Sequence, residues 1–245
     1  MKTGLFFIPL AGLLLANAAQ AAVCQNVNGA PTTVDYDLST TLTAAQNAAG
    51  NTVQLTKNQE VNVQAVCPAG SAFSNRTYRS YVSPYAVVET SGPWKYLKLD
   101  PDYLGGAMRI DDSAAGTLYL PTNYAYMGTD DSVNAGKPFY IRDSNLVFQL
   151  KIARPFVGTV TITPKTMFNV YVTTGTSDPL SNVVYNIAYS GTVTVPQSCE
   201  INAGQTILVD FGSLYSGGFN RAGAKPVSVR NKKFRVPVKC SGVNS

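Results

Sequence analysis

The feature that most constrains the fold is a series of short runs in which apolar and polar residues alternate. Val61–Val66 and Leu146–Ile152 are such runs, and others lie at 159–163, 169–172, 191–195 and 234–238. They are rich in Val, Thr, Ile and Tyr and are bounded by Gly, Pro, Asn or Asp, which is the pattern of half-buried strands between turns. The sequence therefore predicts an all-β chain built as an antiparallel sandwich or barrel.

One segment departs from this pattern. Residues 41–49 have helical composition, and Gly50 follows them directly. Because Gly favours helix ends, a helix of about two turns that stops at Gly50 is expected here. Over the whole chain only 13% of residues are charged, about half of the roughly 25% usual for soluble domains. Gly, Pro, Thr and Asn occupy the positions that charged residues would otherwise hold, and this composition again favours short strands and turns.

The N-terminus has the pattern of a secretory signal. Lys2 supplies a positive charge, residues 5–16 form an apolar run, and Ala19 and Ala21 are the small residues of a cleavage site. We expect residues 1–21 to be removed after export. The apolar run is too short to span a membrane, and no later stretch approaches the roughly 18 apolar residues that a span requires, so no membrane span is expected.

Export places the four cysteines in an oxidising compartment, where an even number indicates disulfides. Four cysteines allow three pairings. The economical pairing is one local bridge in each half of the chain, Cys24–Cys67 and Cys199–Cys240. The cysteines are too widely spaced for a zinc knuckle, so we expect no metal site.

The chain contains no histidine. Its absence excludes Ser-His-Asp and Cys-His nucleophiles and histidine metal sites. A secreted glycosidase needs only two carboxylates and stays an alternative, but no well-spaced acid pair stands out. Asp100, Asp102 and Asp111 have part of the spacing of a calcium loop, yet Leu104 occupies a ligand position and the final Glu is missing. We therefore expect no enzyme activity and no cofactor.

Charge divides the chain near residue 190. Residues 22–191 carry 11 Lys and Arg against 12 Asp and Glu, whereas residues 192–245 carry 7 against 2. We predict a first domain over 22–190 and a second unit over 191–245. An immunoglobulin-like sandwich needs about 100 residues, so the second unit is expected to be the first part of a longer domain and the chain a fragment. Because the first domain is not basic, no nucleic-acid partner is expected.

The second unit resembles the pilin domains of bacterial chaperone–usher fimbriae. The likeness lies in GTVTVPQSCEINAGQ at 191–205, VDFGSL at 209–214, a turn with Phe219, Ala222 and Gly223, and VPVKC at 236–240. The front domain resembles the lectin domains of F17-like and uroepithelial-cell adhesins, through NRTYRSYV at 75–82 and DSNLVFQL at 143–150. The whole mature chain is thus similar to a two-domain fimbrial tip adhesin.

This resemblance implies a fold, partners and a location. The front domain would be an immunoglobulin-like lectin sandwich for a host glycan, and the pilin domain an immunoglobulin-like sandwich that lacks its last strand. A periplasmic chaperone and then the next fimbrial subunit would donate that strand, with an outer-membrane usher on the export route. Only Ala22 and Val23 precede Cys24 in the mature chain. They leave no room for a donor strand, which favours the fimbrial tip at the cell surface.

Aromatic residues concentrate at positions 73–140, which hold 12 of the 23 in the mature chain. Aromatic rings cover the apolar face of a sugar, while short carboxylates and amides bind its hydroxyls. The candidate carbohydrate site comprises Trp94, Arg109, Asp111, Tyr124, Tyr126 and Asp130. Two alternatives stay open: these aromatics belong to the sandwich core, and the protein is a structural fimbrial subunit or adaptor without lectin activity.

Overall fold

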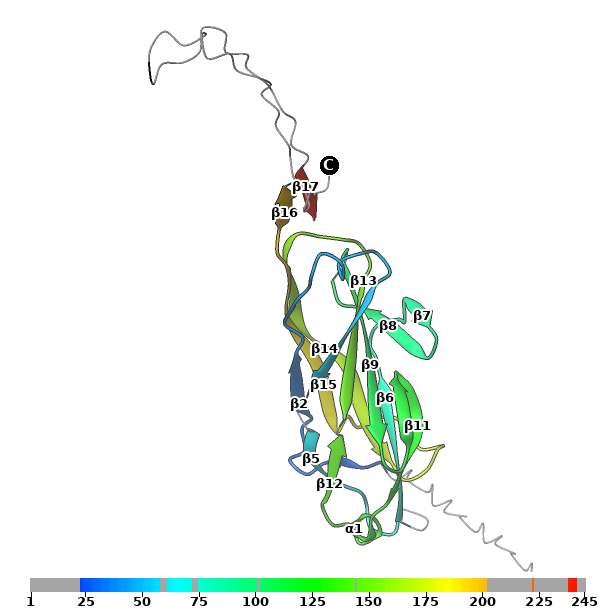
Figure 1. The fold of residues 1–245 in the computed structure, drawn as a ribbon. Coiled ribbons are helices and arrows are strands. Elements are labelled where there is room, and N and C mark those ends of the chain that lie inside the picture. The colour runs from blue at the N-terminus through cyan, green and yellow to red at the C-terminus, as the bar shows by residue number, and fades with distance from the viewer. Residues whose placement is uncertain are drawn as a thin grey trace, which may run out of the picture.

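The computed structural model describes residues 23–57, 61–71, 75–100, 102–143, 145–201, 222 and 238–241. Regular structure in these ranges is almost entirely β-strand, which confirms the all-β prediction. Two large sheets pack face to face as a sandwich, and a small third sheet lies at one end beside the short helix α1 (Asp131–Asn134) (Figure 1).

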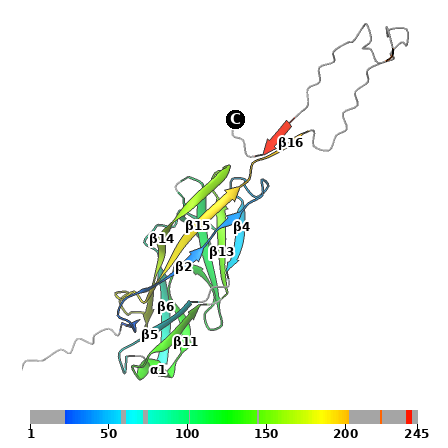
Figure 2. The ribbon, with the colours of Figure 1, turned by 90° about the vertical axis from the view of Figure 1, so that its left-hand side faces the viewer.

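The first large sheet contains the longest strands. Its strand order is β11 (Thr122–Thr129), β6 (Arg76–Val82), β14 (Gly158–Thr173), β15 (Tyr185–Val195) and β2 (Thr32–Asp37), with β3 (Thr40–Thr41) also on β15. Most pairs are antiparallel, but β2 and β3 run parallel to β15. Figure 2 shows β14, β15 and β2 side by side along the length of the sandwich.

The second large sheet packs against the first. Its strand order is β4 (Thr52–Lys57), β13 (Leu146–Ile152), β9 (Leu104–Asp112), β8 (Trp94–Lys98) and β7 (Glu89–Ser91), with β10 (Gly116–Leu120) also on β9. The small sheet has the order β1 (Gln25–Asn26), β5 (Val61–Val66) and β12 (Phe139–Asp143). All pairs in these two sheets are antiparallel.

The alternating runs in the sequence are strands where the structure describes them. They are β5 and β13, two parts of β14 and the end of β15. The run at 234–238 lies, apart from Val238, outside the described residues. No helix in the described part of the chain has the length and apolar character needed to cross a membrane.

The prediction of a helix over residues 41–49 is wrong. Thr41 ends β3, and the residues after it form turns. The reason is tertiary: the buried Asn47 side chain donates to the Phe156 carbonyl over 2.6 Å and accepts from the Phe156 N–H over 3.2 Å. The Gln46 side chain also accepts from the Thr43 N–H. These side-chain bonds stabilise a non-helical backbone against the helical propensity of the segment.

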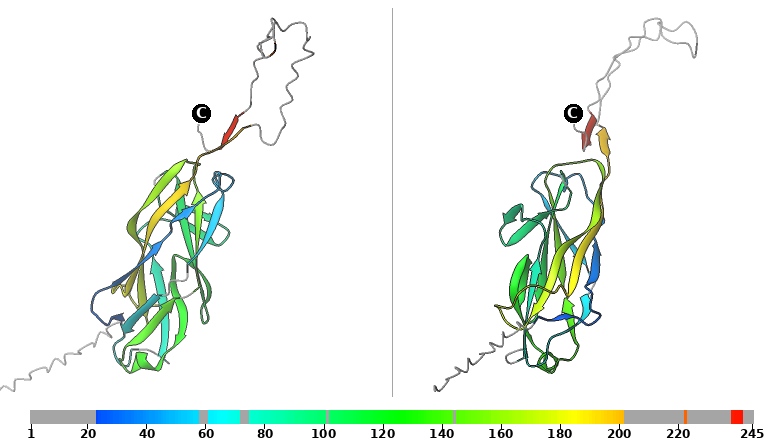
Figure 3. Two further views of the ribbon diagram at one scale, coloured as in Figure 1. Left: turned by 60° about the vertical axis from the view of Figure 1, so that its left-hand side comes forward. Right: turned by 180° about the vertical axis from the view of Figure 1, so that it is seen from behind.

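The predicted boundary at residues 190 and 191 falls inside β15. That strand pairs with β14 as far as Val195, opposite Gly158. Beyond it, β16 (Ser198–Ile201) pairs with β17 (Val238–Ser241), at the end of the molecule opposite α1 (Figure 3). Most of residues 191–245 lies outside the described residues, so the division into two domains, and the incomplete pilin domain, stay predictions.

Aromatic residues join the two large sheets in the core. Phe148 of β13 contacts Tyr36 of β2 and Tyr189 of β15, with ring centroids 5.1 and 5.2 Å apart. Phe168 of β14 continues the cluster from Tyr189 at 6.2 Å. All four side chains are buried. Each tilted or edge-on pair adds about 0.5–1.5 kcal/mol beyond the burial of its area.

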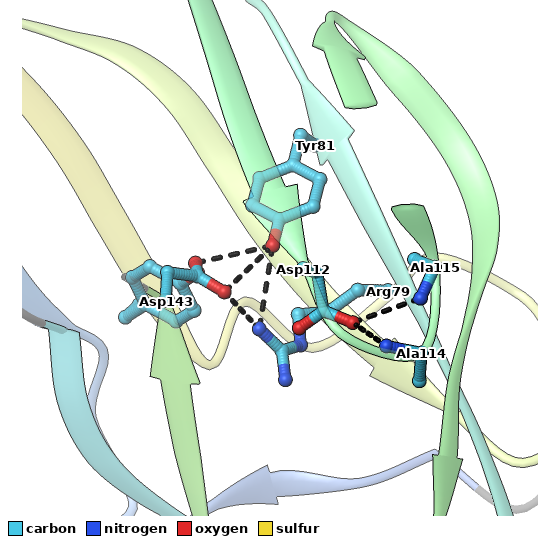
Figure 4. Close-up of polar contacts among 7 residues, drawn as sticks. Arg79, Tyr81, Asp112, Ala114, Ala115 and Asp143 are labelled. Atoms are coloured by element: carbon cyan, nitrogen blue, oxygen red, sulfur yellow. Dashed lines mark hydrogen bonds and ion pairs between the residues drawn. The ribbon is translucent and has the colours of Figure 1, made fainter. Parts of the chain in front are cut away.

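A buried ion pair joins the small sheet to the first large sheet. The Arg79 guanidinium of β6 donates to the Asp143 carboxylate of β12, and both side chains are buried (Figure 4). The Tyr81 hydroxyl lies 3.0 and 3.1 Å from the two carboxylate oxygens, and the Tyr185 hydroxyl donates to Oδ2. One buried carboxylate thus has three donors, which compensates for the loss of its hydration.

The ion pair fixes the charge of its members. Burial alone lowers the pKa of Arg79, but the Asp143 carboxylate opposes this and holds the pKa above its ordinary value. Burial, followed by the charge of Asp143, raises the pKa of both Tyr81 and Tyr185. The tyrosines therefore stay neutral and can donate their protons to the carboxylate.

Separating the two charges should destabilise the fold strongly. Arg79→Met leaves a buried carboxylate without its cation and should cost about 3–5 kcal/mol, whereas Arg79→Met with Asp143→Leu should cost less than the sum of the single changes. Glu89→Gln removes an exposed partner of Lys151 and should cost at most about 1 kcal/mol. Urea unfolding of the four variants measures this. Additive costs of Arg79→Met and Asp143→Leu would contradict a coupled pair.

The buried tyrosines should make the fold sensitive to alkali. Burial, then the nearby Tyr36, raises the pKa of Tyr189. Unfolded tyrosine ionises near pH 10, so below about pH 10 the buried tyrosines are neutral in both states and make their full contribution to the free energy of unfolding. Above that pH it should fall by about 1.4 kcal/mol per pH unit for each such tyrosine. Urea unfolding between about pH 8 and pH 11 measures the slope.

Tyr189→Phe tests this interpretation, because the Tyr189 hydroxyl is buried without a hydrogen-bond partner in the described residues. The variant should be at least as stable as the parent near pH 8, since no hydrogen bond is lost. It should also lose stability less steeply above about pH 10. An unchanged alkaline slope would show that Tyr189 does not contribute.

Candidate functional site

A cavity of about 390 Å³ lies beside the disulfide between Cys24 and Cys67. This bridge confirms the first predicted pairing and ties the start of the described chain to the end of β5. The cavity is lined by Val23, Gln25, Val66, Cys67, Pro68, Ala69, Ala135 and Gly136. Val23 precedes β1, Gln25 and Val66 belong to β1 and β5 of the small sheet, and the other residues lie in the turn after β5 and the turn after α1.

Two turns approach each other closely at this cavity. The Gly70 N–H donates to the Asn134 carbonyl over 2.9 Å. Gly136 has a φ of +63°, and a Cβ placed there would lie 3.0 Å from the Ala69 Cβ and 3.2 Å from its nitrogen. A larger residue at position 136 would be strained and would push the turns apart. Because the side chains of these two turns are small, backbone atoms form most of this wall of the cavity.

Helix α1 holds the second of these turns. Asp130 is its N-cap: the carboxylate accepts from the Ser132 N–H over 2.8 Å. Val133 is fully buried, and the Asn75 amide donates to the Asp131 carboxylate. A cap of this kind stabilises a helix end by about 1 kcal/mol. Asp130 is therefore a structural residue in this conformation, five residues before Ala135 in the turn that lines the cavity.

The structure brings three of the six predicted sugar-binding residues together. The Arg109 guanidinium lies 5.8 Å from the centre of the Trp94 ring, and its Nη2 pairs with the Asp111 carboxylate over 3.0 Å. The Thr117 hydroxyl donates to the same carboxylate. Tyr119 contacts Trp94 edge-on at 5.1 Å. This Trp94 cluster, formed by Trp94, Arg109 and Asp111, is half-exposed on β8 and β9 of the second large sheet.

The other three predicted residues lie elsewhere. Tyr124 and Tyr126 are on β11 of the first large sheet. The Tyr124 hydroxyl donates to the Asp178 carbonyl over 2.8 Å, and Tyr126 packs on Tyr78 with ring centroids 5.7 Å apart. Asp130 caps α1. None of the six lines the cavity, so the sugar-binding role given to them stays a prediction.

Sequence reasoning missed the cavity because its walls are small apolar side chains and backbone. The one available signal was the disulfide followed by Pro68-Ala69-Gly70, a turn sequence fixed at its start by a covalent bridge.

The positions of the backbone are compatible with the second predicted bridge, Cys199–Cys240. Cys199 and Cys240 are directly opposite each other in the β16–β17 pair. Such positions lie about 4.5–5.5 Å apart between Cα atoms, a separation that a disulfide can span. Their side chains lie outside the described residues, so this pairing stays a prediction.

Comparisons with known proteins point to one class. A family profile described as "Fimbrial protein" matches residues 187–245. The type 1 fimbrin D-mannose specific adhesin of Salmonella typhimurium is 50% identical over 234 residues, which are 94% of this chain and 69% of that protein. The probable minor fimbrial subunit LpfD of Escherichia coli O157:H7 is 24% identical over 209 residues, 82% of this chain and 59% of that protein.

Solved structures with similar folds include two adhesins. The receptor binding domain of MrkD1P of Klebsiella pneumoniae has a TM-score of 0.36 and 11% identity, covering 76% of this chain and 99% of that one. The CupB6 tip adhesin of Pseudomonas aeruginosa has a TM-score of 0.40 and 10% identity, covering 70% and 41%. The 50% identity to the Salmonella protein over nearly the whole chain shows the family. The chain belongs to the fimbrial adhesins, exported surface proteins that mediate bacterial attachment.

Proposed function

We propose that the protein is the tip adhesin of a fimbria and that it binds a terminal mannose-type hexose of host-surface glycans in the cavity beside Cys24–Cys67. The observation that carries the proposal is the 50% identity, over 94% of the chain, to an adhesin described as D-mannose specific. The cavity adds a place for the ligand. Its volume of about 390 Å³ lies within the range of about 300–1,000 Å³ typical of small-molecule sites.

The position of the cavity suits attachment. The small sheet and α1 lie at one end of the sandwich, and β16 and β17 lie beyond the other end (Figure 1). The pilin-like segment that follows β15 would connect the protein to its fimbria. A ligand site at the opposite end would then face away from the fimbria, toward the host surface.

The assembly partners follow from the pilin resemblance. The incomplete sandwich predicted for residues 191–245 would take a donated strand from a periplasmic chaperone during export, pass through an outer-membrane usher and then receive the strand of the next subunit. Strand donation of this kind satisfies an open sheet edge that would otherwise aggregate. A tip position requires no donor strand before Cys24.

The Trp94 cluster is a second candidate sugar site. The observation in its favour is that an aromatic ring, a guanidinium and a carboxylate meet on one exposed sheet face. Against it, Asp111 is already engaged by Arg109 and Thr117, and the Trp94 ring packs on Tyr119. Because Tyr124, Tyr126 and Asp130 are held by other contacts, only this half of the predicted site is kept as a candidate.

One set of variants separates the two sites. Ala135→Trp places a large ring at the cavity wall and should weaken mannose binding by at least about tenfold, equivalent to about 1.4 kcal/mol. Trp94→Ala should leave the affinity unchanged. Ala45→Trp, on an exposed turn outside the cavity, is the matched control for adding a tryptophan. Isothermal titration of the purified mature chain with methyl α-D-mannoside gives the dissociation constants, after a glycan array on the parent protein.

Each outcome decides between the alternatives. Loss of binding in Trp94→Ala alone would move the site to the Trp94 cluster. An array on which the parent binds no glycan would overturn the lectin function and favour a structural subunit or adaptor.

A further inference from the structure

A second cavity, of about 180 Å³, lies on the outer face of the second large sheet. Its lining includes Glu89 of β7, Lys98 of β8, Gly105 of β9 and Lys151 of β13. Lys98 is exposed there, whereas Leu97 beside it on the strand is buried in the core. In the described part of the chain this cavity shares no lining residue with the cavity beside the disulfide. We call it the Gly105 pocket.

Gly105 lies in the middle of a row of residues that crosses the sheet. The register pairs it with Lys98 on one side and with Lys151 on the other. Residues paired in this way point to the same face of a sheet. The row therefore presents two lysine side chains with a gap between them, and the gap belongs to the pocket because all three residues line it.

Neither the backbone nor the packing requires glycine at position 105. Its φ is not positive, and an added Cβ would have only ordinary contacts, 3.7 Å from the Tyr96 Cβ and 3.8 Å from the Lys151 Cβ. The next residue differs, because a Cβ on Gly106 would lie 2.6 Å from the Cδ1 of Leu99. A glycine inside a strand weakens the strand and often marks a close approach by a ligand. Packing thus explains Gly106, whereas Gly105 leaves space that a side chain would fill.

The lining around the gap is largely apolar. Tyr96, Leu104 and Ala153 belong to it, and Tyr96 is only 1% exposed. The Tyr96 hydroxyl donates to the Gln149 side chain, so this residue adds carbon to the pocket but no free polar group. Val88 also lines the pocket, and at 60% it is the most exposed of the large hydrophobic residues in the described ranges. Exposed apolar surface of this kind often marks a binding site.

One positive charge at the pocket is available to a ligand. Glu89 and Lys151 form an ion pair with each other. The Asp100 carboxylate accepts two backbone N–H groups of the turn that follows it, both over 2.9 Å. Lys98 is exposed, and its ammonium has no hydrogen-bond or ion-pair partner among the described residues. The pocket therefore combines an apolar lining with a single unpaired cation.

We propose that the Gly105 pocket binds a small amphipathic carboxylate, with its apolar group in the gap at Gly105 and its carboxylate beside the Lys98 ammonium. Burial of the apolar group supplies most of the affinity, and the exposed ion pair selects the sign of the charge. The volume is below the range of about 300–1,000 Å³ for sites that enclose a whole drug-sized ligand, so one ring or one branched alkyl group fits. β7 has three residues, too few for many backbone bonds to an added strand, which favours a free small molecule over an extended peptide.

Titration of the isotope-labelled mature chain with phenylacetate, followed by amide chemical shifts, tests the site. The Gly105 amide should shift with a dissociation constant on the order of 1 mM, as expected for a ligand of about ten non-hydrogen atoms. Phenylacetamide has the same shape without the charge and should bind about three- to fivefold more weakly, because an exposed ion pair contributes little.

Two variants separate the apolar gap from the charge. Gly105→Val fills the gap and should weaken phenylacetate binding at least about tenfold, while unfolding at the same or a higher urea concentration because valine favours strands. Lys98→Met should abolish the preference for phenylacetate over phenylacetamide. Lys137→Met removes an exposed lysine that does not line the pocket, so it is the matched control and should keep that preference.

The results test this site independently of the mannose proposal, because neither Gly105→Val nor Lys98→Met should change the affinity for methyl α-D-mannoside. The absence of a saturable shift of the Gly105 amide up to about 20 mM phenylacetate would overturn the site. Undiminished binding in folded Gly105→Val would place the ligand elsewhere and also overturn it. A preference kept by Lys98→Met as fully as by Lys137→Met would show that the proposed class of ligand is wrong.

Discussion

The ion pair between Arg79 and Asp143 is the interaction on which the arrangement of the molecule depends. It joins the small sheet to the first large sheet in a region from which water is excluded. A buried carboxylate is tolerated only when its charge and its lone pairs are satisfied, and Asp143 meets this condition through Arg79, Tyr81 and Tyr185. Any displacement of β12 would break several of these bonds together. The small sheet is thus held in one position relative to the sandwich.

The cavity depends on that position. β5 pairs with β12 from Val61 to Ala65 and ends directly before Cys67, whose bridge holds Cys24. The turn after Cys67 then meets the turn that ends at Gly136. Because one wall of the cavity begins at the disulfide and the other at the capped helix α1, little conformational entropy would remain to be lost on binding of the proposed ligand. Preorganisation of this kind favours affinity without requiring many contacts.

The parts of this structure that sequence could predict are those with local signals. Alternation marked β5 and β13 correctly, and the cysteine spacing gave Cys24–Cys67. The helix predicted over residues 41–49 is wrong because the Asn47 side chain bonds to Phe156. These positions are far apart in the chain, so a local stretch of sequence does not show the contact. The cavity was missed for a related reason: Ala69, Ala135 and Gly136 have no chemistry of their own, and only the fold makes them a wall. The density of aromatic residues predicted a sugar-binding role for Trp94 and Tyr126. In the structure their rings pack on those of Tyr119 and Tyr78.

Strand β12 shows why the buried ion pair and the side chains on the outer face of the strand cannot vary independently. Its inward residues end with Asp143, and its outward residues are Tyr140 and Arg142. A slip of one residue would turn every side chain of the strand to the other face of the sheet. Asp143 would then lose Arg79, while Arg142 would enter the core without a carboxylate placed to receive it. The cost of burying that charge forbids the slip. The same ion pair that anchors the small sheet therefore also determines that Tyr140 faces outward, beside the cavity.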